Sequence, residues 1–140
     1  MRRRRFNRRG ASAIEFGLTL PVLLIICSAV IEYGMVFFQQ SALIGAARDG
    51  TRYGATVDTD DDPEGEAEDR AREVLTGYGL DCSNALTCDV TAELDFDGTN
   101  NFWFLRVSIE RVYEPVLDLL PTPNYVRAEM VMLIEDQVIP

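Results

Sequence analysis

The longest uncharged stretch of the chain runs from Phe16 to Ile31, between Glu15 and Glu32, and holds sixteen mostly apolar residues. Beyond Glu32 the chain stays uncharged until Arg48. A helix needs about 20 predominantly apolar residues to cross the hydrocarbon core of a bilayer, so this part of the chain is long enough to do so. We predict a membrane-spanning helix, with residues 16 to about 38 held in the membrane.

The flanking charges predict the orientation of this helix. Residues 1–10 contain six arginines and no acid, whereas residues 11–140 contain seven arginines and 23 acids, a net charge of −16. Positive residues before a membrane helix favour the cytoplasmic side. We therefore expect a single-pass protein of the inner (cytoplasmic) membrane, surrounded by lipid, with a cytoplasmic N-terminus and an extracytoplasmic acidic body. That body would repel a polyanion, so no nucleic-acid partner is expected.

Two ordinary explanations of such an N-terminus are a secretory signal peptide and a plain signal anchor. A signal peptide has an apolar core of about 7–15 residues and a small-residue cleavage site, whereas the present run is longer and shows no clear site. A signal anchor accounts for the arginines and the apolar run, but it leaves Glu15 unexplained. An ionisable group inside a membrane helix costs about 2.5–3.5 kcal/mol on insertion scales, which makes it a functional hypothesis.

Glu15 therefore needs a positively charged partner. Arginines at the cytoplasmic edge are one candidate. A cut after Gly10 would create another, because the α-amine of Ala11 would then be cationic at neutral pH and could pair with Glu15 of a neighbouring copy. Glu32 lies about 100° around the helix from Glu15, so the two acids do not share a face. For Glu32, contact with water at the outer membrane boundary is favoured over pairing between subunits.

The helix is expected to continue beyond the membrane, from Ala11 to about Tyr53, which is roughly 65 Å at 1.5 Å per residue. Apolar and small residues keep a helical spacing there, and Asp49-Gly50 and Tyr53-Gly54 are the first stop signals. Small residues at 45–47 would let another element pack closely. Pro21 removes one helical hydrogen bond; a bend and simple tolerance are both open interpretations.

The residues around Glu15 resemble a known processing site. "RRG" at residues 8–10 followed by "ASAIEF" at 11–16 is similar to the cleavage site of type IV prepilins, and Glu15 is fifth counting from Ala11. Three further elements are "IEFGLTLPVLL", "IEYG" at 31–34 and "AARDGTRYGA" at 46–55. With these, residues 8–55 resemble TadE-like pseudopilins of the tight-adherence (Flp/Tad) pilus system.

This resemblance implies roles for four residues. Gly10 would precede the cut, Ala11 would become the mature N-terminus, and Glu15, followed by Phe16, would direct processing and assembly. The implied partners are a prepilin peptidase, other pilin and pseudopilin subunits, and an inner-membrane assembly platform. The chain would be the substrate of the peptidase and would support pilus biogenesis, adhesion and biofilm formation.

Residues 58–69 hold eight acids and no basic residue. Alternating acids at 58, 60 and 62 suggest calcium, but an EF-hand loop requires glycine at its sixth position and glutamate at its twelfth. Here those positions are Pro63 and Asp69. A solvated loop leading into a helix, with Asp62-Pro63 as cap and first turn, is the favoured interpretation.

The remaining sequence predicts a small α+β head. Residues 64–76 have the pattern of a short amphipathic helix, and strands are expected at 88–96, 102–113 and 125–134. The expected inward-facing residues are Val90, Ala92, Leu94 and Phe96 in the first strand, Leu105, Val107 and Ile109 in the second, and Val126, Ala128, Met130 and Met132 in the third. At least two rings of "FWF" at 102–104 are expected in the core, and "DFDGTN" at 95–100 is expected to form a hairpin turn.

Cys82 and Cys88 form a candidate disulfide if the head faces an oxidising compartment. Without histidine, the chain has no Ser-His-Asp or Cys-His arrangement, and it shows no phosphate-binding loop. We expect no enzyme activity, cofactor or structural metal. The expected division is a leader at 1–10, a transmembrane and stalk helix at 11–55, and a head at 56–140. The competing hypothesis is an unprocessed, signal-anchored binding module, with calcium or an extracellular ligand bound by the head.

Overall fold

The computed structural model describes residues 8–58, 61–98 and 102–134. Its elements, in chain order, are α1 (Arg8–Gly54), α2 (Pro63–Gly77), β1 (Cys88–Asp97), β2 (Phe102–Val112) and β3 (Tyr125–Leu133). The predicted α+β class, the long N-terminal helix, the short second helix and the three antiparallel strands are all confirmed. The third strand, for which the sequence signal is weakest, is present as well.

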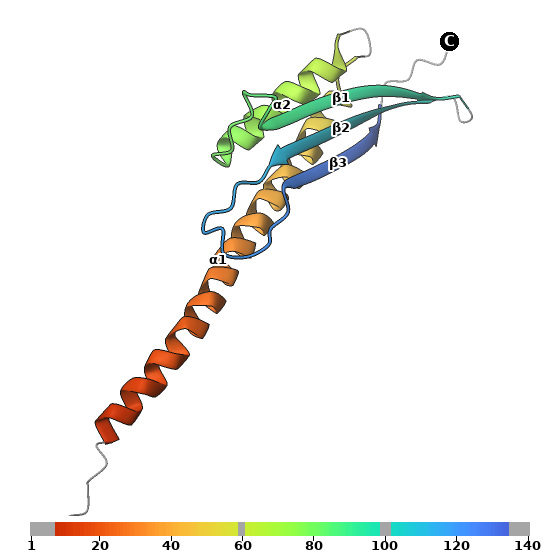
Figure 1. Cartoon of the computed structure of the whole chain (residues 1–140). Helices are drawn as coiled ribbons and strands as arrows, with labels where there is room; N and C mark the ends of the chain where they lie inside the picture. Colours follow the sequence, from red (N-terminus) through yellow and green to blue (C-terminus); the bar gives the residue numbers. More distant parts are fainter. Residues whose placement is uncertain (1–7, 59–60, 99–101, 135–140) are drawn as a thin grey trace, which may run out of the picture.

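Helix α1 is a single helix of 47 residues, about 70 Å long at 1.5 Å per residue. It continues through Pro21 without a break in the helix. Its first half extends away from the rest of the molecule, as Figure 1 shows in red and orange, whereas its second half lies against the sheet. We call residues 12–31 the anchor segment and residues 32–54 the packed segment.

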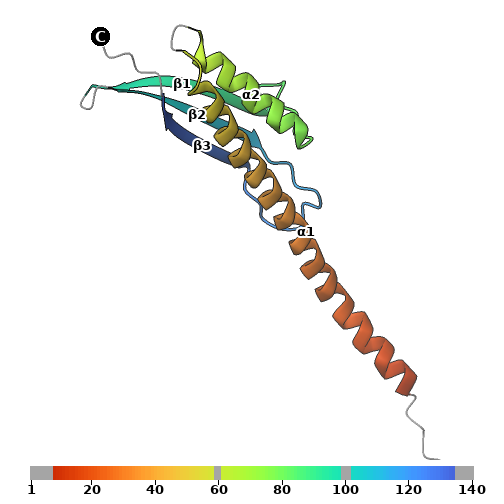
Figure 2. The ribbon, with the colours of Figure 1, turned by 180° about the vertical axis from the view of Figure 1, so that it is seen from behind.

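The sheet has the strand order β1-β2-β3, with both neighbouring pairs antiparallel. The register pairs Val90 with Ile109, and Ile109 with Ala128, so apolar residues of all three strands share one face. Both helices cover that face. In Figure 1 the sheet lies in front of α1, and in Figure 2, which is seen from behind, the helices lie in front of the sheet. The packed segment lies under β2 and β3, and α2 lies beside it under β1.

Small residues let α1 and α2 approach closely, but the closest contacts are at Gly50 and Gly54 and not at the expected residues 45–47, where a Cβ on Gly45 would lie 3.8 Å from the Tyr78 hydroxyl. A Cβ atom added to Gly54 would lie 2.5 Å from Cδ2 of Leu105 and 2.6 Å from the Cβ of Ala67. One added to Gly50 would lie 2.7 Å from the carbonyl oxygen of Ala67. The side chains packed around this contact are fully or almost fully buried: Ala42, Leu43, Ala46, Ala47, Ala67, Ala71, Leu75, Leu105, Val107 and Ile109.

Some expectations about individual residues are wrong. Helix α1 does not end at Gly50 but continues to Gly54. The absence of a side chain at Gly50 allows the close contact with α2. Phe96 is 47% exposed and Met132 is 37% exposed, although both have the inward-facing parity. The β1–β2 hairpin extends past the ends of the helices in Figure 1, so neither helix covers this end of the sheet.

The aromatic residues at 102–104 are not in the core either. Phe102 and Phe104 are half-buried on the face opposite the helices, and Trp103 is 39% exposed. The Trp103 ring packs on Phe96, with 4.8 Å between ring centroids. Of the predicted hairpin turn, Gly98 is described as part of a turn, whereas residues 99–101 lie outside the described residues.

Candidate assembly site and the Glu32 contact

The residues of the predicted processing site lie at the start of α1. The backbone of Gly10 and Ala11 is helical, and residues 1–7 of the predicted leader lie outside the described residues. Glu15 is exposed, and Phe16 is 64% exposed. Within the described part of the chain no hydrogen bond or ion pair is found for Glu15, so its carboxylate is available to a group from another molecule.

The anchor segment exposes apolar side chains on every side. All side chains from Ser12 to Cys27 are exposed, and Leu18, Ile25 and Val30 are 73%, 57% and 70% exposed. A helix that is apolar all round requires an apolar environment. By length and composition the described helix from Ser12 to Gly54 qualifies as a membrane span, with none of its most apolar window buried within the chain. This helix therefore fits a single-pass membrane anchor.

Glu32, directly after the anchor segment, has a very different environment. Its side chain is only 1% exposed. Its Oε1 accepts hydrogen bonds from the backbone N–H of Val116 at 2.9 Å and from the hydroxyl of Tyr113 at 3.0 Å, and its Oε2 accepts one from the N–H of Leu117 at 2.9 Å. All three donors belong to residues 113–124, which we call the β2–β3 loop. The acid thus ties this loop to α1.

Two tyrosines complete this contact. The Tyr33 hydroxyl donates to the carbonyl oxygen of Pro121 at 3.0 Å, and Tyr113 is 4% exposed. Burial, followed by its hydrogen bond to the Glu32 carboxylate, raises the pKa of the Tyr113 phenol above its usual value. The phenol therefore stays protonated and keeps donating to Glu32 at any physiological pH.

The expectation that Glu32 contacts water at the outer membrane boundary is wrong. The reason is that the β2–β3 loop folds back along α1 and supplies three donors from its own backbone and side chains. Buried carboxylates are tolerated when hydrogen bonds of this kind compensate for the lost water. Sequence reasoning missed this site because the donors lie more than 80 positions away and two of them are backbone groups.

Among the acids of residues 58–69, Asp62 caps a helix, and Glu64 and Glu68 bind the backbone of the sheet. Asp62 caps α2, as predicted: its carboxylate accepts from the N–H of Gly65 at 3.1 Å. Glu64 and Glu68 accept the backbone N–H groups of Leu94 and Ala92, at 2.7 and 3.0 Å. Asp60 of the alternating set lies outside the described residues. Among the residues that are described, no three acidic or cysteine side chains are arranged to hold a metal ion.

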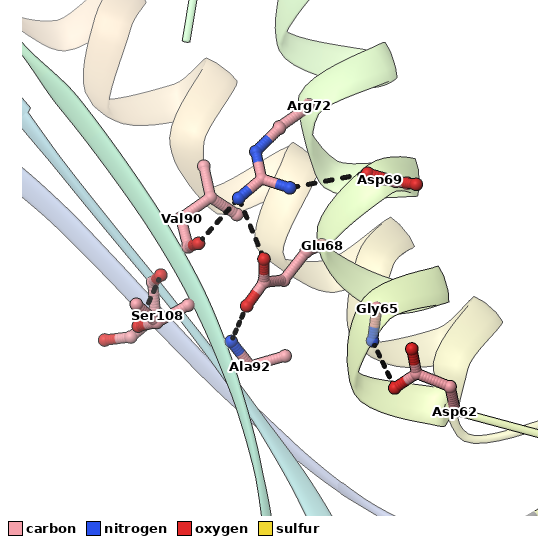
Figure 3. A network of polar contacts seen from close by, with 9 residues as sticks. Asp62, Gly65, Glu68, Asp69, Arg72, Val90, Ala92 and Ser108 are labelled. Atoms are coloured by element: carbon pink, nitrogen blue, oxygen red, sulfur yellow. Dashed lines mark hydrogen bonds and ion pairs between the residues drawn. The ribbon is translucent and has the colours of Figure 1, made fainter. Parts of the chain in front are cut away.

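Glu68 is the centre of a small polar network, shown in Figure 3. Its second carboxylate oxygen pairs with Arg72 at 2.8 Å, and Arg72 also donates to the carbonyl oxygen of Val90 at 3.1 Å. One side of α2 therefore satisfies donors and an acceptor along the outer edge of β1. An uncovered edge strand is a template for pairing with another chain, so this network protects β1 from such pairing.

Cys82 and Cys88 are joined by a disulfide in the structure. Both are buried, at 6% and 2% exposure, and the bond closes the connection between α2 and β1. Arg111 donates to the carbonyl oxygen of Asp81 beside this bridge, at 2.8 Å. Cys27, in the anchor segment, is free and exposed.

The described chain thus combines a long apolar helix, whose first half extends away from the head, with a small three-stranded sheet that packs on its second half. In the comparison with protein families, residues 10–52 match the family described as TadE-like protein, which is about a third of the chain. The match confirms the resemblance found in the sequence, and this N-terminal part of the chain is TadE-like. The comparisons with curated proteins and with solved structures returned no match.

Proposed function

We propose that this protein is a pilin-like structural subunit or assembly factor of a tight-adherence (Flp/Tad) pilus, processed by a prepilin peptidase between Gly10 and Ala11. The observation that carries the proposal is the TadE-like match, which begins at Gly10. Counted from Ala11, Glu15 is the fifth residue, which is the position that the proposal requires. The exposed Glu15, which has no partner among the described residues, lies near the start of an exposed apolar helix and supports the proposal.

In this proposal, the anchor segment holds the protein in the inner membrane, with the leader in the cytoplasm and the head outside. Cleavage frees the α-amine of Ala11, which pairs with Glu15 of a neighbouring subunit as the helices pack side by side. The pair neutralises two charges that would each be costly near lipid. It also fixes the axial position of one helix against the next, so Glu15 selects and aligns subunits. The role is structural and the chain performs no catalysis of its own.

The first test is the N-terminus of the protein recovered from membranes of a host with the complete pilus system. Intact-mass measurement is expected to show a chain that starts at Ala11. A chain that retains residues 1–10 would contradict processing and would favour the signal-anchored binding module.

The second test separates processing from assembly. We expect Glu15→Ala to be recovered from the membrane but lost from the sheared pilus fraction, because the Ala11 amine then has no partner. Glu93→Ala is the matched control, because it removes the same side-chain atoms from an exposed position on β1 and not from α1. If the pilus fraction contains as much of the Glu15→Ala protein as of the control protein, the proposed pairing is refuted.

A further inference from the structure

The β2–β3 loop carries exposed apolar side chains at a place where the head meets the membrane helix. We propose that this loop is a second membrane contact, with Val116, Leu117 and Leu119 inserted into the interfacial layer of the bilayer that α1 crosses. The inference rests on the membrane anchoring in the proposed function, but it does not depend on processing or on a pilus.

The position of the loop along α1 is the first argument. Because the head binds α1 from Glu32 onward, we place the membrane span at residues 12–31 and not at 16 to about 38 as the sequence suggested. This anchor segment is about 30 Å long at 1.5 Å per residue, which equals the thickness of the hydrocarbon core. Glu32 follows directly, and its carboxylate binds the N–H groups of Val116 and Leu117. The loop is therefore held at the level where hydrocarbon gives way to headgroups. In Figure 1 it is the part of the head nearest to the exposed half of α1.

The chemistry of the loop surface is the second argument. Val116, Leu117 and Leu119 are 56%, 41% and 67% exposed. Ile31, directly before the Glu32 that binds Val116 and Leu117, is 52% exposed, so exposed apolar side chains of α1 reach the level of the loop. An exposed apolar patch in continuity with a membrane span is most simply covered by the same lipid.

Charged residues in the loop set how deep it lies. Glu114 and Asp118 are both exposed, and a carboxylate is excluded from the hydrocarbon core. The loop therefore lies in the interface and does not cross it. Tyr33, 41% exposed and bonded to Pro121, is the kind of aromatic residue that collects at this level. Since the loop has no basic residue, its contact does not require anionic lipid.

Glu32 acts in this arrangement as a positioning residue. Its three hydrogen bonds satisfy its charge internally, so an acid next to lipid needs no water and no second subunit. The same bonds fix the loop backbone so that the apolar side chains remain at the membrane surface. The partner that competes for this surface is a neighbouring subunit, and the experiment below distinguishes the two.

The test uses tryptophan fluorescence of the full chain in phosphatidylcholine vesicles whose acyl chains carry bromine either near the headgroup or near the end. Three single-tryptophan proteins are compared: the native chain with Trp103, and Leu119→Trp and Leu23→Trp, each combined with Trp103→Phe. Trp103 lies at the distal end of the sheet and should not be quenched. Leu119→Trp should be quenched most by shallow bromine, and Leu23→Trp most by deep bromine.

The outcomes separate this inference from the proposed anchor. If Leu23→Trp is quenched and Leu119→Trp is not, the anchor stands and the loop contact is refuted. If Leu23→Trp is not quenched, the membrane anchor itself fails, and the loop contact with it. A blue shift of Leu119→Trp that appears only at high protein density, without quenching, would assign the surface to a neighbouring subunit and overturn the proposal.

The role of Glu32 is tested in the Leu119→Trp, Trp103→Phe protein. Adding Glu32→Ala should release the loop and reduce the shallow quenching of Leu119→Trp, whereas Glu93→Ala should leave it unchanged. Circular dichroism of both variants shows whether the fold is retained. Equal quenching in a folded Glu32→Ala protein would refute the positioning role of Glu32.

Discussion

The two halves of α1 belong to one continuous helix, yet they meet entirely different surroundings. The anchor segment exposes large apolar side chains in every direction, and its one acid before residue 32, Glu15, has no partner among the described residues. The packed segment buries small residues such as Ala46 and Ala47 on one face. Local helix formation is the same in both halves. The side chains, and not the backbone, therefore determine which half of α1 packs on the head and which half is suited to an apolar environment.

The acids in the two halves show the same contrast. Glu15 is exposed, and no hydrogen bond or ion pair is found for it among the described residues, so its carboxylate is open to a group from another molecule. Glu32 is buried and its charge is satisfied by the β2–β3 loop of its own chain. Two glutamates in similar sequence contexts, "AIEFG" and "VIEYG", therefore have opposite environments, one exposed and one buried. The mutations below apply matched changes to the two environments, beginning with the largest expected effect.

The sharpest comparison is the same truncation in each half of α1. Leu43→Ala should lower the free energy of unfolding of the head by about 2–5 kcal/mol, because it opens a cavity at a fully buried site. Leu23→Ala, at 56% exposure, should leave the head unchanged. Chemical unfolding of the full chain in detergent, followed by Trp103 fluorescence, measures both. Equal effects would contradict the division of α1 between lipid and protein.

A smaller effect is expected from adding one methyl group to glycines in the same helix. Gly54→Ala should destabilise the head by about 1–3 kcal/mol, because the new Cβ would overlap Leu105 and Ala67 and force them apart. Gly34→Ala meets no atom within 4 Å and should be neutral, or stabilising by roughly 0.5–1 kcal/mol through helix propensity. Thermal unfolding of the two variants side by side gives the sign. A tolerated Gly54→Ala would mean that α1 and α2 do not pack this closely.

The sequence predicts most of this fold because its signals are local. Helical spacing of apolar residues, the Asp62-Pro63 cap and the alternation in the strands gave the elements to within a few residues. Burial at the ends of the sheet was not predictable in the same way. Phe96 and Met132 continue the inward parity of their strands, but the helices end before they reach those positions.

The candidate site also has one part that local sequence signals predict and another part that they do not. The motif around Glu15 lies within a few consecutive residues, so the sequence alone indicates it, and the TadE-like match covers it. The partners of Glu32 come from backbone groups of a loop that no local pattern assigns to α1. The acids of residues 58–69 show the same division. The local Asp62-Pro63 signal predicts the helix cap, whereas no local pattern indicates that Glu64 and Glu68 accept hydrogen bonds from the backbone of β1.

The smallest expected effect concerns this edge of the sheet. Glu68→Ala removes the acceptor for the N–H of Ala92 and the partner of Arg72, and should cost about 1 kcal/mol, since Glu68 is partly exposed. It should also raise self-association, because the edge of β1 loses part of its cover. Glu66→Ala is the matched control: Glu66 is exposed in the first turn of the same helix. Unfolding and light scattering measure the two effects. If the control and Glu68→Ala behave alike, α2 covers β1 by packing alone and its acids serve only to cap and solubilise the helix.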